Sequence, residues 1–110
     1  MDALGANPDI PDMSLKAQAR HLKHLRKDGC YPGMSLEEYI KRAGELARSA
    51  VGGDIVGYKI AEGDAVVRYN RATNDFAKGF DTGVATMFKP SGGERYYQKQ
   101  FNEDGGVFDD

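Results

Sequence analysis

The hydrophobic pattern of the chain changes its period at Gly52-Gly53, and this change divides the fold into two halves. Before these glycines, apolar residues recur every three or four positions, as they do along one face of an α-helix. After them, short extended segments alternate with turn residues, as they do in a sheet of antiparallel strands. Because the helices precede the strands instead of alternating with them, we expect an α+β domain.

Two helices are predicted in the first half. Ser14 can cap a helix that runs to about Lys27, and its stripe of apolar side chains is expected to face the core. Ser35 and Glu38 form a capping box for a second helix, which Gly52-Gly53 would stop. The stripe of the first helix consists of Leu15, Ala19, Leu22 and Leu25, and that of the second consists of Leu36, Tyr39, Ile40, Ala43, Leu46, Ala47 and Ala50.

Four strands are predicted in the second half, at about 55–61, 65–70, 75–80 and 84–89. The connectors between them are so short that neighbouring strands must be antiparallel. Residues 94–101, which follow the Ser91-Gly92-Gly93 loop, fit either a last strand or a short helix. The expected architecture is therefore two N-terminal helices packed on one face of an antiparallel sheet of four to five strands.

Charge divides the chain into three segments. Residues 1–13 carry a charge of −3 and contain two prolines, so we expect a flexible linker outside the core. Residues 14–101 carry +5 and would form the single domain that 110 residues allow, and residues 102–110 would form an acidic tail of −4. A basic body is compatible with a polyanionic ligand such as RNA, although the net charge of the whole chain is −2.

Composition argues against a membrane-spanning protein and against a disulfide-stabilised one. No stretch approaches the roughly 18 consecutive apolar residues of a membrane span, and Met1 to Asp12 contains no apolar signal core. Cys30 is the only cysteine, so the fold cannot depend on an internal disulfide. We expect this thiol, in a Gly-Cys-Tyr-Pro-Gly turn, to be a spectator.

His21 and His24 lie three residues apart in a stretch that also contains the cations Arg20, Lys23, Arg26 and Lys27. Three interpretations are open: a solvated basic helix face, half of a metal site, or acid–base catalysis on a polyanion. Zinc would need a third protein ligand, and the surrounding cations would repel it, so we expect no metal and no cofactor. The same cations would lower the histidine pKa from its usual value near 6.5 and keep the ring neutral as a base.

A neutral histidine beside fixed cations suits the cleavage of RNA by its own 2′-hydroxyl. This reaction needs a base that removes the hydroxyl proton and an acid that protonates the leaving 5′-oxygen. Cations and hydroxyl donors would stabilise the extra negative charge of the transition state. The candidates for this role are Lys23, Arg68, Thr86 and Lys89. Tyr96 and Tyr97 could stack on unpaired bases, and Phe88 is a further candidate for substrate binding. Taken singly, each of the strand and aromatic residues is more typical of an ordinary strand or core position.

Four segments of the chain together resemble the C-terminal RNase domains of bacterial polymorphic toxins. They are His-Leu-Lys-His at 21–24, Leu-Glu-Glu-Tyr-Ile at 36–40, Arg-Tyr-Asn-x-x-Thr-Asn-Asp-Phe at 68–76 and Gly-Val-Ala-Thr-Met-Phe-Lys-Pro at 83–90. These toxins belong to the barnase, EndoU, colicin and RelE-like group (BECR). Within it, the segments are similar to tRNase domains of contact-dependent growth-inhibition toxins and to the colicin D nuclease domain. The resemblance covers residues 16–97.

The resemblance implies a role for individual residues. His24 would be the catalytic base, with Lys23 beside it and His21 at a position where colicin D has another basic residue. Thr86 would hydrogen-bond the scissile phosphate, and Arg68 would be a second phosphate ligand. Phe88 and Lys89 match an aromatic residue followed by lysine, although colicin D has tryptophan at the aromatic position. The acidic end after Phe101 has no counterpart in the family.

The resemblance also implies a function. The chain would be a monomeric, metal-independent endoribonuclease toxin that cleaves tRNA and leaves a 2′,3′-cyclic phosphate. It would be secreted as the C-terminal part of a larger effector, act in the cytoplasm of a target bacterium and be blocked by a cognate immunity protein. Two other functions remain open: a non-catalytic RNA- or protein-binding module that uses the basic helix only for its charge, and a metal-dependent nuclease.

Overall fold

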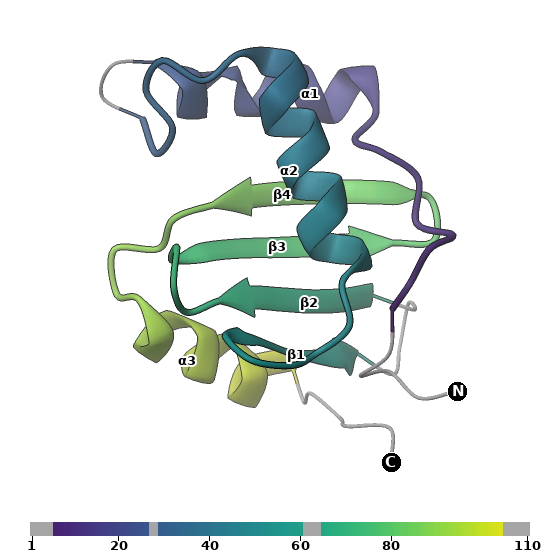
Figure 1. The fold of residues 1–110 in the computed structure, drawn as a ribbon, viewed down its shortest axis with the longest axis vertical. Helices are drawn as coiled ribbons and strands as arrows, with labels where there is room; N and C mark the ends of the chain where they lie inside the picture. Colours follow the sequence, from purple (N-terminus) through teal and green to yellow (C-terminus); the bar gives the residue numbers. More distant parts are fainter. Residues whose placement is uncertain (1–5, 27–28, 61–64, 105–110) are drawn as a thin grey trace.

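The computed structural model describes residues 6–26, 29–60 and 65–104, which form an α+β domain (Figure 1). This architecture confirms the predicted fold class. The elements in chain order are α1 (Leu15–His21), the 3₁₀-helix η1 (Leu22–Leu25), α2 (Leu36–Arg48), β1 (Ile55–Ile60), β2 (Ala65–Asn70), β3 (Asp75–Phe80), β4 (Gly83–Phe88) and α3 (Glu94–Asp104).

The four strands form one antiparallel meander in the order β1-β2-β3-β4. Their observed bounds differ from the predicted ones by a single residue at most, apart from Ala61, which lies outside the described residues. The register between β3 and β4 shifts, because Lys78 pairs with Thr86 whereas Gly79 pairs with Val84. Ala85 is therefore an extra residue on β4, and this bulge redirects the side chains that follow it.

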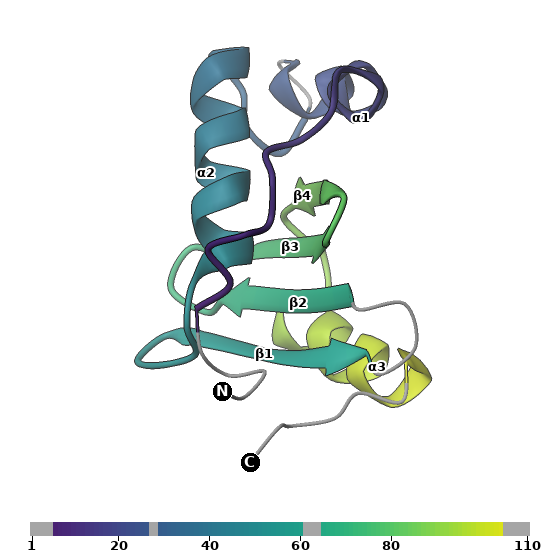
Figure 2. The ribbon, with the colours of Figure 1, turned by 90° about the vertical axis from the view of Figure 1, so that its right-hand side faces the viewer.

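Helices cover both faces of the sheet (Figure 2). α2 crosses β2, β3 and β4 on one face, where Tyr39, Ala43 and Ala47 are fully buried. α3 lies against the other face and buries Tyr97 among the aromatic side chains of β1, β2 and β3. The segment that the sequence left open between strand and helix is thus a helix, and the sheet has four strands in the described part of the chain.

Ser35 caps the start of α2 as predicted, since its hydroxyl accepts a hydrogen bond from the Glu38 backbone N–H at 3.1 Å. The helix ends at Arg48, however, and not at Gly52-Gly53. Ala50, which was expected on its buried face, is exposed beyond the helix. No helix in the described residues is both long and apolar enough to cross a membrane.

The predictions for α1 were wrong in two respects. The α-helix ends at His21 and continues only as the single 3₁₀ turn η1. Its expected core stripe mostly faces outward, with Leu15 82% and Leu22 46% exposed. The inward side instead carries Ala17, and His21 follows it at the four-residue spacing that places two side chains on one helix face. Of the expected stripe, Leu25 alone packs against the core cluster in the described part of the chain.

Residues 6–13 are part of the folded domain, contrary to the linker prediction. Ile10 and Met13 are buried in the core with α2. The carbonyl of Pro11 accepts a hydrogen bond from the Val84 N–H at 3.1 Å, and the Arg48 side chain donates to the carbonyl of Ile10 at 3.0 Å. Proline has no N–H to donate but keeps its carbonyl, so Pro11 can still pair with the edge of β4.

The first three residues of the predicted acidic tail belong to a helix. Residues 102–104 continue α3, and the Tyr58 hydroxyl donates to the Asp104 carboxylate at 2.8 Å. The remaining residues of the predicted tail, 105–110, lie outside the described part of the chain, as do residues 1–5 of the predicted linker.

Candidate active site

α1 and η1 place two histidine rings beside the end of β4. The rings of His21 and His24 are stacked, with centroids 5.3 Å apart and planes inclined by 11°. The His24 ring also lies 6.2 Å from the Tyr39 ring of α2 and 6.4 Å from that of Phe88, to which it is nearly parallel. Three aromatic neighbours from three different elements therefore fix the orientation of His24.

Burial lowers the pKa of both histidines. For His24 burial is the largest cause, followed by the repulsion of a positive charge by His21 and Lys23. For His21 burial again acts first, and Arg20 and Lys23 add to it, while a hydrogen bond to the Ala85 backbone opposes the change. Both shifts favour the neutral ring at pH 7, and burial contributes more to them than the neighbouring cations do.

These lowered pKa values predict that the domain loses stability in mild acid. The unfolded chain binds protons at the usual histidine pKa of 6.5, whereas the folded chain binds them only at lower pH. The free energy of unfolding should therefore be highest above pH 6.5 and fall as the pH decreases through 6.5 towards the folded pKa values. Urea unfolding at a series of pH values measures this free energy, and a His21→Asn/His24→Asn double variant should lack most of its decline in acid. An equally steep decline in the double variant would contradict the attribution of the pH dependence to the two histidines.

Beside His24 the surface forms a hollow of about 500 Å³ with a cationic lining. Lys23 and His24 come from η1, Arg26 follows it, and Lys89 follows β4. Gly29 and Cys30 complete the described lining, which contains no acidic side chain. Such a hollow attracts an anion. Three of the predicted site residues, Lys23, His24 and Lys89, are brought together here.

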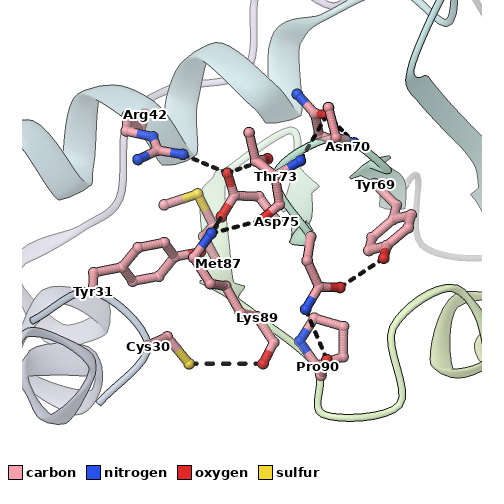
Figure 3. A network of polar contacts seen from close by, with 12 residues as sticks. Cys30, Tyr31, Arg42, Tyr69, Asn70, Thr73, Asp75, Met87, Lys89 and Pro90 are labelled. Atoms are coloured by element: carbon pink, nitrogen blue, oxygen red, sulfur yellow. Dashed lines mark hydrogen bonds and ion pairs between the residues drawn. The ribbon is translucent and has the colours of Figure 1, made fainter. Parts of the chain in front are cut away.

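Lys89 is held at the hollow by a buried carboxylate (Figure 3). Its ammonium group lies 3.0 Å from Asp75 Oδ1, donates to the carbonyl of Thr73 at 2.6 Å and sits over the Tyr31 ring at 5.1 Å from its centroid. Asp75 is only 4% exposed and also accepts hydrogen bonds from the Tyr31 and Thr73 hydroxyls and from Arg42. The position of Lys89 therefore depends on Asp75.

Sequence reasoning did not single out Asp75. Burial alone would raise the pKa of this carboxyl, but the hydrogen bonds from Thr73, Tyr31 and Lys89 outweigh burial and lower it, so Asp75 is charged. Its sequence signal is an aspartate at the first position of a strand, where this residue type is uncommon. That signal marks an unusual residue but does not reveal its partners, which come from α2, two turns and the end of β4.

Thr86 and Phe88 lie on β4 next to the histidines. Thr86 directly follows Ala85, whose backbone bonds His21, and it is partly exposed. Phe88 packs against Phe76 and Tyr96 at 5.4 Å between ring centroids, besides its stacking with His24. Phe88 thus orients the His24 ring, and Thr86 lies two positions before it on β4; neither residue is part of the described lining of the hollow.

Two predicted site residues are not at the site. Arg68 is 0% exposed, and its guanidinium donates from Nε to the Ser49 carbonyl at the end of α2 at 2.8 Å and from Nη1 to the Val67 carbonyl at 2.9 Å. Tyr97 is buried under α3, where its ring stacks on Tyr69 at 5.6 Å. Both predictions were wrong because these side chains fulfil structural roles: Arg68 binds a helix C-terminus and Tyr97 fills the second core.

No family model, curated protein or solved structure matches this chain. Its chemistry must therefore be inferred from the hollow itself. Across the described ranges, no three His, Cys, Asp or Glu side chains are grouped as ligands for a metal ion. What the hollow offers is one neutral imidazole beside the cations Lys23 and Arg26, with Lys89 ion-paired to Asp75 at its edge, and this set is suited to proton transfer on a bound polyanion.

Proposed function

We propose that the chain is an endoribonuclease domain of a bacterial toxin, which cleaves tRNA by metal-independent transesterification. The observation that carries the proposal is the shared hollow, in which His24 lies among Lys23, Arg26 and Lys89. A binding module would need the cations alone. The oriented imidazole with a lowered pKa adds a group that can take a proton at neutral pH, and this favours catalysis.

In this reaction His24 removes the proton from a ribose 2′-hydroxyl. The 2′-oxygen forms a bond to the adjacent phosphorus as the bond from phosphorus to the 5′-oxygen breaks. The leaving 5′-oxygen takes up a proton from solvent or from a neighbouring ammonium group. The products are a 2′,3′-cyclic phosphate and a 5′-hydroxyl. Lys23, Arg26 and Lys89 stabilise the charge that accumulates on the phosphate oxygens.

Incubation of the purified domain with total tRNA and excess chelator tests this function. We expect discrete cleavage products, because no step requires a metal ion. Lys99→Gln serves as a control, since Lys99 is an exposed cation of α3 that does not line the hollow. Intact tRNA under these conditions would contradict the proposal. Cleavage that chelator abolishes would indicate a metal-dependent nuclease, and binding without cleavage would indicate a binding module.

The toxin setting of the proposal comes from the sequence resemblance. The domain would be delivered by a larger secreted effector into the cytoplasm of a target bacterium. A cognate immunity protein with an acidic surface would complement the cations of the hollow and block it. If the product of the neighbouring reading frame neither binds nor inhibits the domain, this part of the proposal fails.

A further inference from the structure

Residues 29–31 are joined to η1 through their backbone. The Tyr31 N–H donates to the carbonyl of His24 at 2.7 Å. Gly29 lies against the same turn, because a Cβ at this position would collide with the carbonyl oxygens of Lys23 and His24. Glycine allows such a close approach of two backbones because it has no Cβ. The backbone of Tyr31 is therefore fixed relative to that of the proposed base.

The side chain of Tyr31 contacts Lys89 and Asp75 (Figure 3). The Lys89 ammonium lies over the tyrosine ring, with Nζ 5.1 Å from the centroid, and the Tyr31 hydroxyl donates to Asp75 Oδ1 at 2.7 Å. Lys89 Nζ donates to the same carboxylate oxygen at 3.0 Å. Two donors thus share Oδ1, and the Tyr31 hydroxyl makes the shorter of the two hydrogen bonds.

The sharing of this oxygen affects what Lys89 can offer to a ligand. An ammonium group has three N–H donors. Asp75 takes one of them and the Thr73 carbonyl takes another, while the Lys89 side chain keeps 31% of its area exposed and lines the hollow. Without the Tyr31 hydroxyl, Lys89 would be the remaining donor to Oδ1 in the described residues. The carboxylate would then draw the ammonium group closer to itself and away from a ligand in the hollow.

Tyr31 does not itself meet a ligand in the hollow, since it is 3% exposed and is not part of the described lining, whereas His24 and Lys89 are. We propose that Tyr31 is a positioning residue that keeps Lys89 available as a phosphate ligand beside His24. Its backbone is bound to His24, and its hydroxyl keeps Asp75 from withdrawing the Lys89 ammonium. The part of this inference that concerns cleavage rests on the proposed function, whereas phosphate binding by Lys89 can be measured without cleavage.

The first experiment titrates the domain with inorganic phosphate at about pH 7.5, above the usual histidine pKa, and follows the His24 ring signals by NMR. Tyr31→Phe removes the hydroxyl and keeps the ring, and we expect phosphate affinity to fall by about 3- to 10-fold, the size of one hydrogen bond. Lys89→Gln should lose at least as much. In the Lys89→Gln background, Tyr31→Phe should cost less than about 2-fold, because both changes act through one contact.

Tyr58→Phe is the matched control. The buried Tyr58 hydroxyl also donates to a carboxylate, that of Asp104 at 2.8 Å, but it lies in the second core, so its loss should leave phosphate binding unchanged. Wild-type affinity in Tyr31→Phe, an equal loss in Tyr58→Phe, an equal loss with and without Lys89, or no phosphate binding by the wild type would each overturn the inference.

The second experiment measures tRNA cleavage by the same variants. We expect kcat/KM to fall in Tyr31→Phe by about the same factor as phosphate affinity, and to fall less when Lys89 is already replaced. Equal cleavage by Tyr31→Phe and Tyr58→Phe would reject the positioning role and leave the proposed function intact. If the wild-type domain cleaves no tRNA, the proposed function fails and the phosphate titration alone decides the role of Tyr31.

Discussion

An Asp75→Asn variant is expected to lose about 3 kcal/mol of its free energy of unfolding. The carboxylate is buried and accepts hydrogen bonds from Tyr31, Thr73, Arg42 and Lys89, and an amide could not neutralise the two cations. Removing one partner of a buried ion pair costs about 3–5 kcal/mol. The lower end applies because Arg42 and Lys89 each keep roughly a third of the side chain exposed and can be rehydrated.

Urea unfolding at neutral pH measures this loss. A matched control is Glu103→Gln, which makes the same acid-to-amide change in the exposed Lys99–Glu103 pair and should cost less than about 0.5 kcal/mol. Acid provides a second check, because the pKa of Asp75 is lowered from its usual 3.8. Its stabilising contribution is complete above pH 3.8 and is lost as the pH falls through the folded value, so wild type and variant should converge there. If wild type and Asp75→Asn had equal free energies of unfolding at neutral pH, the stabilising role of Asp75 would be contradicted.

A His24→Asn variant is expected to cleave tRNA about 10²- to 10⁴-fold more slowly than the wild type. Asparagine retains a short polar side chain but cannot take a proton from the 2′-hydroxyl, and general base catalysis contributes a factor of this size. Because burial lowers the pKa of His24 from 6.5, wild-type kcat should be level above pH 6.5 and fall in acid as the ring becomes protonated. The residual rate of the variant should not show this titration.

Cleavage rates of the two proteins across this pH range test the prediction. Lys99→Gln again serves as the control with wild-type behaviour. A His24→Asn rate equal to that of wild type would exclude His24 as the base and would leave the hollow as a binding site for phosphates. Urea unfolding of His24→Asn shows whether the variant is folded, and so separates a loss of catalysis from a loss of structure.

The parts of the fold that sequence predicted well have strong local signals. The strands are separated by short turns rich in Gly, Asn and Asp, and their positions follow from the turns. α2 begins at a capping box and presents a regular buried face. By contrast, α1 has only seven residues, and the spacing of apolar residues in so short a helix does not determine which face is turned towards the core. Contacts with the rest of the domain determine this face, and it carries Ala17 and the histidines instead of Leu15.

The candidate site was predicted in part for a similar reason. Lys23 and His24 are neighbours in sequence, and Lys89, just after the end of β4, lines the same hollow. Strand alternation shows which face a residue occupies but not how deeply it is buried, which is why Arg68 was wrongly placed at the site. Asp75 was missed because its partners are 2 to 44 residues away in sequence.

The chemical nature of the ends of cleaved tRNA tests the central claim most directly. The reaction is run with excess chelator, and the fragments from wild-type and His24→Asn proteins are compared. Transesterification at His24 predicts 2′,3′-cyclic phosphate and 5′-hydroxyl ends with the wild type, and almost none of them with the variant. Fragments that carry 3′-hydroxyl and 5′-phosphate ends, or tRNA that remains intact with the wild type, would contradict it.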